Sequence, residues 1–243
     1  MSKQITSLTF FRFETRRSML WAFFMMQFAR APLKKVGGLE RFFLMGTGKP
    51  GFNPSPDWKT YALLQVWSNQ QAADYFFNSH PTYSAYVRQS TEVLRVMMRN
   101  LRAHGEWNAE NPFRRSSDVD PHNPYITAIT RATIKTRLQF KFWRAVPDSQ
   151  RYLIDNPGLL MTKGIGEVPF RNMATFSIWR SEEALKDFAY SNAHHKKAIE
   201  QTRAFNWYKE ELFSRFQPYQ VYGTYQGASL DMNLAHERQA SEE

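Results

Sequence analysis

Two stretches of the sequence repeat one pattern of apolar and polar positions. Each is a short apolar run that ends in Trp, and the two tryptophans, Trp67 and Trp179, stand 112 residues apart. A Ser or Asn that can cap a helix follows each Trp, and Gln or Glu stands in the first turn after it. This pattern is typical of a capped helix that begins after a strand. The same spacing pairs Ala72 with Ala184. We interpret this echo as the duplication of a half-chain unit.

The elements around each echo follow one order. The pattern predicts, in the first half, strand 8–13, helix 16–31, strands 39–46 and 59–67, helix 69–88 and strand 93–104, and in the second half, strand 125–137, helix 138–155, strands 159–166 and 171–179, helix 181–204 and strand 211–225. Each half therefore has the βαββαβ order of a ferredoxin-like fold. We expect an α+β protein of two fused ferredoxin-like repeats, of the dimeric α/β-barrel type. The two sheets would pack on one another within one chain or across a dimer.

A polar stretch separates the two predicted repeats. Residues 108–124 are rich in Asn, Pro, Asp and Ser, so we predict a linker there. The N-terminal repeat is then 1–107 and the C-terminal repeat is 125–229. We expect the polar residues 230–243 to form a disordered tail.

The composition excludes several kinds of functional site but does not identify a binding partner. The 243 residues contain no cysteine, which excludes disulfides, thiolate metal sites and c-type haem attachment. The formal net charge is +10, but Lys and Arg are scattered in short pairs. We therefore expect a generally solvated basic surface and no nucleic-acid partner, while a basic RNA-binding or lipid-binding module stays open as a non-enzymatic alternative.

The first apolar segment resembles a targeting leader. Arg16 and Arg17 precede an apolar run from Met19 to Ala29, as in a twin-arginine signal. The run is short for a membrane-spanning helix, which needs about 20 residues, and a predicted strand precedes it. We therefore expect the first helix of a folded, cytoplasmic protein.

Two adjacent histidines provide the candidate chemistry. If the helix that begins near Ser181 continues at about 100° per residue, Leu185, Phe188, His195 and Ile199 share one stripe and His194 faces solvent. An inward histidine is either a satisfied core residue or the proximal ligand of a b-type haem iron. Neither the glycine-rich stretch 46–51 nor any other motif has the spacing of a nucleotide site.

Several blocks resemble the spheroidene monooxygenase family in order and spacing. They are Thr130–Lys135, Phe142–Pro147, Gly164–Pro169, Thr175–Trp179, His195–Ile199 and Trp207–Phe216, with Gly46–Gly48, Trp58 and Trp67 upstream. The resemblance extends from about residue 8 to residue 227. It implies a haem b enzyme of carotenoid biosynthesis that uses O2 and an electron donor such as a ferredoxin to introduce a keto group into an acyclic carotenoid or a similar apolar substrate. Because such a substrate is dissolved in the membrane, the resemblance also gives the basic surface and the aromatic segment Met19–Phe28 a use in peripheral docking on the inner membrane.

The resemblance assigns the iron ligand, and the positions of other residues suggest further roles as hypotheses. His195, rather than His194, would bind the iron, and Phe188, Ile199 and Trp207 would contact the haem within the C-terminal repeat. Arg131 is a catalytic candidate that would face the open side of the haem or pair with a propionate, with a structural ion pair as its alternative.

Ser177 is a second catalytic candidate, which would bond a bound oxygen or act as a structural hydroxyl. A haem-dependent dehydratase or lyase acting on an aldoxime is the rival enzyme on the same fold. The chain can also form a homo-oligomer.

Overall fold

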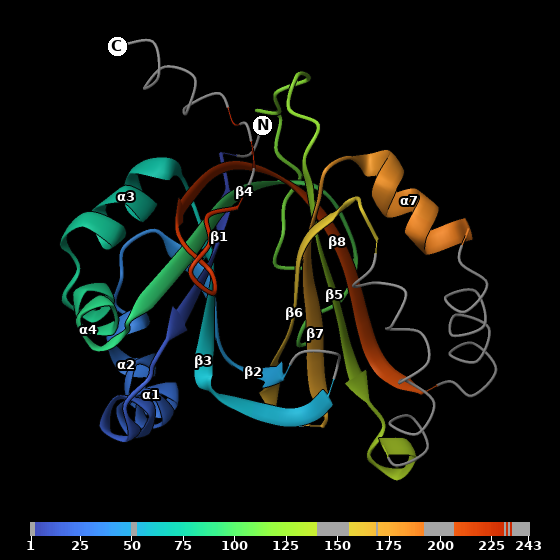
Figure 1. The fold of residues 1–243 in the computed structure, drawn as a ribbon. Helices are drawn as coiled ribbons and strands as arrows, with labels where there is room; N and C mark the ends of the chain where they lie inside the picture. The colour runs from blue at the N-terminus through green and yellow to red at the C-terminus, as the bar shows by residue number, and fades with distance from the viewer. Residues whose placement is uncertain are drawn as a thin grey trace.

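Eight antiparallel strands form a closed barrel, in the order β1-β3-β2-β6-β7-β5-β8-β4 (Figure 1). The computed structural model describes residues 3–49, 53–139, 156–168, 170–191, 207–230, 232 and 234. The strands are β1 (Ile5–Arg12), β2 (Leu39–Lys49), β3 (Asn53–Trp67), β4 (Glu92–Gly105), β5 (Ile126–Ile134), β6 (Leu159–Val168), β7 (Asn172–Trp179) and β8 (Tyr208–Gly223). The helices are α1 (Arg16–Phe28), α2 (Arg30–Leu33), α3 (Gln70–Ser79), α4 (Pro81–Gln89) and α7 (Glu182–Ser191), with a 3-10 turn at Thr136–Leu138.

The predicted strands are present, and the predicted helices within the described residues are present with local breaks. The predicted helix 69–88 is divided into α3 and α4 at His80, whose extended backbone precedes Pro81. Proline has no amide hydrogen, so it begins a new helix here, and the His80 ring accepts a hydrogen bond from the Thr82 amide at 3.2 Å. Most of the predicted helix 138–155 and the second half of the predicted helix 181–204 lie outside the described residues.

The barrel closes within one chain. Strand β2 pairs with β6 at Gly46 and Gly166, and β4 pairs with β8 along most of its length. Each half contributes four adjacent strands, in the orders β4-β1-β3-β2 and β8-β5-β7-β6. The open question of pairing within a chain or across a dimer is therefore settled in favour of a single chain.

The barrel interior is a packed core rather than a channel. Alternate residues of the strands point inward, as the twofold period of a strand requires. They include Leu8, Phe10, Met45, Leu64, Val96, Ile129, Phe176 and Phe216. The interior also takes Trp107 from the end of the predicted N-terminal repeat and Phe113 from the predicted linker. Met232 and Leu234 enter it from the predicted tail, and all four are at most 5% exposed.

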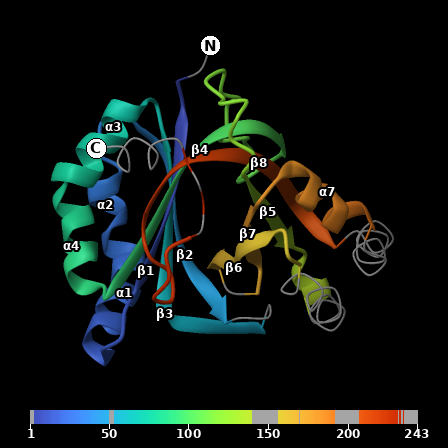
Figure 2. The ribbon, with the colours of Figure 1, turned by 45° about the horizontal axis from the view of Figure 1, so that its top comes forward.

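Helices cover the outer face of the barrel over both of its four-stranded halves. We call the half β4-β1-β3-β2 the first sheet and the half β8-β5-β7-β6 the second sheet. Helices α1 to α4 lie against the sheet of the first half (Figure 2), where they build a second apolar cluster. Helix α7 lies against the sheet of the second half, and Leu185 packs there with Ile126 and Trp179. None of the described helices combines the length and the hydropathy that a bilayer span requires.

Candidate active site

The outer face of the second sheet carries a flat area of small side chains. Three neighbouring strands, β6, β7 and β5, present three aligned rows there. The rows are Thr162–Ser177–Ala128, Gly164–Thr175–Thr130 and Gly166–Met173–Ala132, and we call these nine residues the sheet floor. All except Met173 are Gly, Ala, Ser or Thr. A sheet with such short side chains offers a flat surface on which a planar ligand can lie.

Among the described residues, the centre of the floor is uncovered. A Cβ atom built on Gly164 would meet none of their atoms within 4 Å. Aromatic rings border the floor on two sides. At one end Trp179 packs against Phe188 with ring centroids 5.3 Å apart, and on β8 Phe213 pairs with Thr130 and is 46% exposed. The floor with its aromatic borders therefore suits an apolar, planar group.

Ser177 is the polar group of the floor that contacts Trp179. Its side-chain oxygen accepts a hydrogen bond from Nε1 of Trp179 at 2.9 Å. Because a hydroxyl both accepts and donates, Ser177 retains one hydrogen to donate toward a ligand above the floor. The hydroxyl role predicted for Ser177 is thus compatible with its position, and its bond to Trp179 also serves the fold.

Arg131 lies on the opposite face of the same sheet. Its neighbour across the β5–β7 ladder is Ala174, which belongs to the barrel interior, whereas Ser177 pairs with Ala128 on the outer face. The Arg131 guanidinium is buried, and it forms an ion pair with Glu210 and lies 3.9 Å from an oxygen of Glu167. The sheet separates the two predicted catalytic residues, and the contacts of Arg131 are those of a structural ion pair.

The predicted haem contacts are only partly described. Phe188 lies beside the floor, on α7, through its contact with Trp179. Trp207 is buried just before β8, where its carbonyl accepts a hydrogen bond from the Lys135 amide at 2.9 Å. That position is beyond the far end of the floor on β5. His194, His195 and Ile199 lie outside the described residues.

A buried lysine in the barrel was missed by the sequence reasoning. Lys163 points inward from β6, its side chain is 4% exposed, and its Nζ atom lies 2.8 Å from Oδ2 of Asp57. The sequence carried a signal for this, because Lys163 stands two residues from both Met161 and Ile165 and so shares a face of the strand with them. Both of these residues belong to the barrel interior. A charge this deeply buried needs a partner, and Asp57 supplies it.

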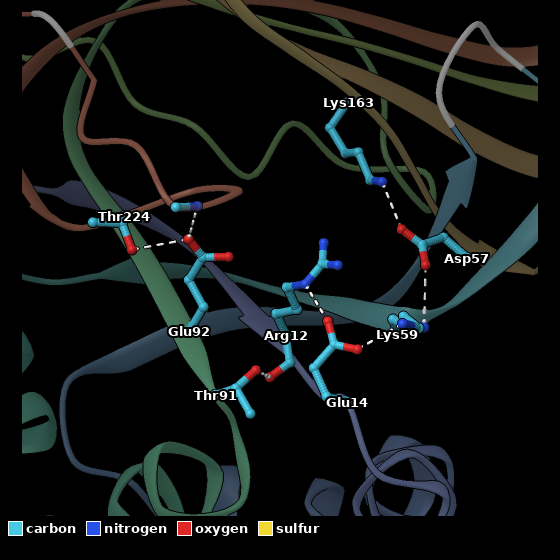
Figure 3. A network of polar contacts seen from close by, with 9 residues as sticks. Arg12, Glu14, Asp57, Lys59, Thr91, Glu92, Lys163 and Thr224 are labelled. Carbon is cyan, nitrogen blue, oxygen red and sulfur yellow. Dashed lines mark hydrogen bonds and ion pairs between the residues drawn. The ribbon is translucent and has the colours of Figure 1, made fainter.

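Lys163 belongs to a chain of ion pairs near one end of the barrel (Figure 3). Asp57 also accepts a hydrogen bond from the Lys59 amide at 3.1 Å, and the Lys59 ammonium contacts Glu14 at 2.6 Å. Glu14 in turn pairs with Arg12 at 2.8 Å. The hydrogen bonds from Lys59 and Arg12 lower the pKa of Glu14, and the bond to Glu14 raises the pKa of Arg12.

A second acidic group nearby anchors the chain after β8. Glu92 accepts hydrogen bonds from the Thr224 hydroxyl at 2.9 Å and from the Gly227 amide at 2.6 Å. Burial raises the pKa of Glu92, but these hydrogen bonds outweigh burial and the net pKa is lowered. The hairpin that Glu92 fixes borders an open cleft of about 490 Å³. The cleft is lined by Leu159–Thr162, Arg180, Tyr225, Gln226 and Ala228–Leu230. Thr162 lines both the cleft and the sheet floor, whereas Leu160, Tyr225 and Leu230 of the cleft pack against the core of the barrel interior.

The described residues offer no metal site of several protein ligands. Within them no three His, Cys, Asp or Glu side chains gather closely enough to hold an ion. A haem iron needs only one or two axial ligands from the protein, because the porphyrin supplies the other four. The short, uncharged side chains of the sheet floor are compatible with a porphyrin face, while the candidate axial ligand, His195, is not among the described residues.

The barrel and its covering helices define a class of α+β protein with a closed antiparallel barrel. Crystal structures of aldoxime dehydratases share the fold. One has a TM-score of 0.61 at 10% sequence identity and covers 88% of this chain and 81% of its own. Another, in complex with butyraldoxime, has a TM-score of 0.61 at 11% identity over 90% and 82% of the two chains. At this identity the likeness concerns the fold alone.

The amino-acid sequence identifies the family. Spheroidene monooxygenase of Rhodobacter capsulatus is 31% identical over 226 residues, which cover 92% of this chain and 93% of that protein. The enzyme of the same name from Cereibacter sphaeroides is 32% identical over 230 residues, covering 92% and 69%. No protein-family model matches the chain. The chain belongs to the spheroidene monooxygenase family, which confirms the predicted resemblance, and it is an oxygenase enzyme.

Proposed function

We propose that this chain is a haem-dependent monooxygenase that uses O2 to introduce a keto group into an acyclic carotenoid or a similarly apolar substrate. The observation that carries the proposal is the sheet floor, which joins a flat surface of small side chains to aromatic borders in the half of the chain that holds most of the family-like blocks. The named relatives support the substrate class.

The haem would lie over the sheet floor with His195 as its iron ligand. Leu185 and Phe188 both face the second sheet, and His195 follows Phe188 by seven residues, about two helical turns. A continuation of α7 would therefore present His195 on the stripe that faces the floor. In this arrangement Phe188 and Trp179 border the ring plane at one end, and Phe213 borders it on β8.

A bound haem supplies the activation of O2, and the chain supplies binding, orientation and exclusion of water. Ser177 would donate its remaining hydrogen bond above the floor, held in orientation by the indole of Trp179. The apolar residues of the adjoining cleft, such as Leu160 and Leu230, would receive the end of a long apolar substrate. An electron donor such as a ferredoxin completes the reaction, because a monooxygenase must reduce one oxygen atom to water.

The barrel would have arisen by duplication of a ferredoxin-like unit. Three observations support this. The two halves have the same strand order. Trp67 and Trp179 stand in equivalent places, each across from an isoleucine on one side and a leucine on the other. A glycine before the second strand of each half approaches the echoed alanine so closely that a Cβ would lie 2.4 Å from that of Ala72 or 2.5 Å from that of Ala184.

The experiment combines spectroscopy with product analysis. The full chain is expressed with adequate haem supply, and the Soret band is compared among wild type, His195→Ala and the neighbouring control His194→Ala. We expect a Soret band in wild type and in His194→Ala and its loss in His195→Ala. With spheroidene, reductant and isotopically labelled O2, we expect the label in a keto product.

Two outcomes would contradict the proposal. A colourless wild type with adequate haem would reject haem dependence, and a His195→Ala variant with an unchanged Soret band would reject the assigned ligand. A haem protein that leaves spheroidene unchanged but dehydrates butyraldoxime would favour the rival dehydratase activity.

A further inference from the structure

Helix α1 packs on the first half of the barrel with small residues and with half-buried large ones such as Trp21, but it leaves other large apolar side chains exposed. Ser18, Ala22 and the following Ala29 are buried against the first sheet. Leu20, Phe23, Phe24 and Phe28, by contrast, are between 48% and 65% exposed. A helix of a water-soluble domain normally shows the reverse arrangement, with polar residues outside. The outward face of α1 is therefore unpartnered within the described chain.

The exposed aromatic residues form one continuous cluster. The Phe23 and Phe24 rings lie 5.8 Å apart, and the Phe24 and Phe28 rings are stacked at 6.1 Å. Trp58, on β3 and 56% exposed, extends the cluster through its contact with Phe23 at 5.9 Å. We call Leu20, Phe23, Phe24, Phe28 and Trp58 the aromatic face. Contiguous exposed apolar surface of this kind marks an interaction site.

Positive charge surrounds the aromatic face. Residues 16–35 contain five basic and no acidic residues, and the five are exposed. They are Arg16 and Arg17 at the beginning of α1 and Arg30, Lys34 and Lys35 beyond its end. The nearest acidic groups along β1 and β3 are already neutralised, because Glu14 pairs with Arg12 and Lys59, and Asp57 pairs with Lys163. The region thus retains its positive charge.

We infer that the aromatic face docks the protein on an anionic lipid bilayer. An apolar strip with cationic ends is the arrangement of a helix that lies in the membrane interface, where rings enter the acyl boundary and Lys and Arg meet headgroup phosphates. Trp58 suits the same depth, since Trp favours the interface. The inference goes beyond the proposed function, because it needs neither haem nor substrate.

Charge argues against a second copy of the chain as the occupant. An antiparallel contact between two α1 helices would place Arg16 and Arg17 of one copy against Arg30, Lys34 and Lys35 of the other. Like charges that face each other across an interface oppose association. A lipid surface rich in phosphate or carboxylate complements the same residues.

The test is flotation of the full chain, without added haem, with vesicles of phosphatidylcholine and phosphatidylserine in equal parts. The test variant carries Phe23→Ser, Phe24→Ser and Phe28→Ser, all at exposed positions, so its thermal unfolding should match wild type. The control is Tyr75→Ser on α3, which removes an aromatic ring that is 65% exposed outside the cluster. Each phenylalanine ring that enters the bilayer should strengthen the binding of the protein to vesicles by about tenfold.

We expect wild type and Tyr75→Ser to float, the triple variant to bind at least about 100-fold more weakly, and wild type to lose binding on pure phosphatidylcholine or at high salt. Equal flotation of the triple variant, or no flotation of wild type, would overturn the inference. So would a wild-type dimer that the triple variant abolishes, or preferential binding of single-stranded RNA. A colourless protein that still floats would reject the proposed function and leave this inference standing.

Discussion

Arg131→Met tests whether Arg131 acts in the fold or in the reaction. The substitution keeps much of the apolar stem and removes a guanidinium that is 2% exposed. It leaves the carboxylates of Glu210 and Glu167, which are 17% and 18% exposed, without their cation. Breaking a buried ion pair costs about 3–5 kcal/mol.

The structure places the cost of Arg131→Met at the lower end of that range. Glu210 still accepts a hydrogen bond from the Ala109 amide at 2.7 Å, and Glu167 still accepts one from Nε1 of Trp107 at 2.9 Å. We therefore expect a loss of about 3 kcal/mol in the free energy of unfolding, which corresponds to a fall in Tm of about 6–12 °C for a chain of this length.

Thermal and denaturant unfolding measure this loss, and the double variant Arg131→Met/Glu210→Gln provides the matched control. Because the amide removes the stranded charge, the double variant should be more stable than Arg131→Met by about 1 kcal/mol or more. Haem content per folded molecule should stay unchanged in both. An Arg131→Met variant of normal stability that loses activity would refute the structural role and restore the catalytic one.

Three further predictions concern the fold around the site. Ser177→Ala should lower the free energy of unfolding by about 1–3 kcal/mol, seen in denaturant titration, because the buried indole of Trp179 loses its acceptor; an unchanged midpoint would argue against that bond. Gly105→Ala should destabilise far more than Gly227→Ala, although both have positive φ. A Cβ on Gly105 would lie 2.1 Å from the Glu211 carbonyl oxygen, whereas one on Gly227 meets nothing within 4 Å; similar Tm losses would contradict this. Stability should fall as the pH drops below about 4.3, the ordinary pKa of a glutamate. Folding lowers the pKa of Glu14 and Glu92. Their stabilising contribution is therefore present above the unfolded pKa and is lost as the pH falls through the folded pKa. Unfolding curves between neutral and acid pH measure it, and a flat profile would refute it.

The strands and their order along the chain could be predicted from the sequence because the signals for them are local. The Trp67 and Trp179 echo marks the same strand end in both halves, and each tryptophan is buried as its apolar run predicts. The break at Pro81 was also readable in principle, since a proline inside a helical pattern begins or ends a helix. The single long helix predicted over it was wrong for that reason.

The face on which a residue lies depends on register, which a single strand does not reveal. Alternation places Arg131 with Ile129 on one side of β5, but only the pairing of Arg131 with Ala174 shows that this side is the barrel interior. Ser177 pairs instead with Ala128 and faces outward. The sequence could therefore nominate both residues without separating them.

The direction of α1 also required the fold. Its sequence is apolar on nearly every side, so periodicity did not decide which residues face the sheet. Packing places Ser18 and Ala22, whose small size permits close approach, against the first sheet, and the other helical positions divide between the half-buried Trp21 and the exposed phenylalanines. The apolar run alone could not predict which of its large residues face outward.

Haem binding over the sheet floor is tested most directly by titrating haem into wild type, Gly164→Phe and Gly37→Phe. In the described part of the chain no atom lies within 4 Å of a Cβ added at either glycine, so both variants should fold, but only the Gly164→Phe ring would occupy the space above the floor. We expect the Soret band of wild type to be retained in Gly37→Phe and to need at least about tenfold more haem in Gly164→Phe. Equal haem affinity in all three proteins would contradict the site.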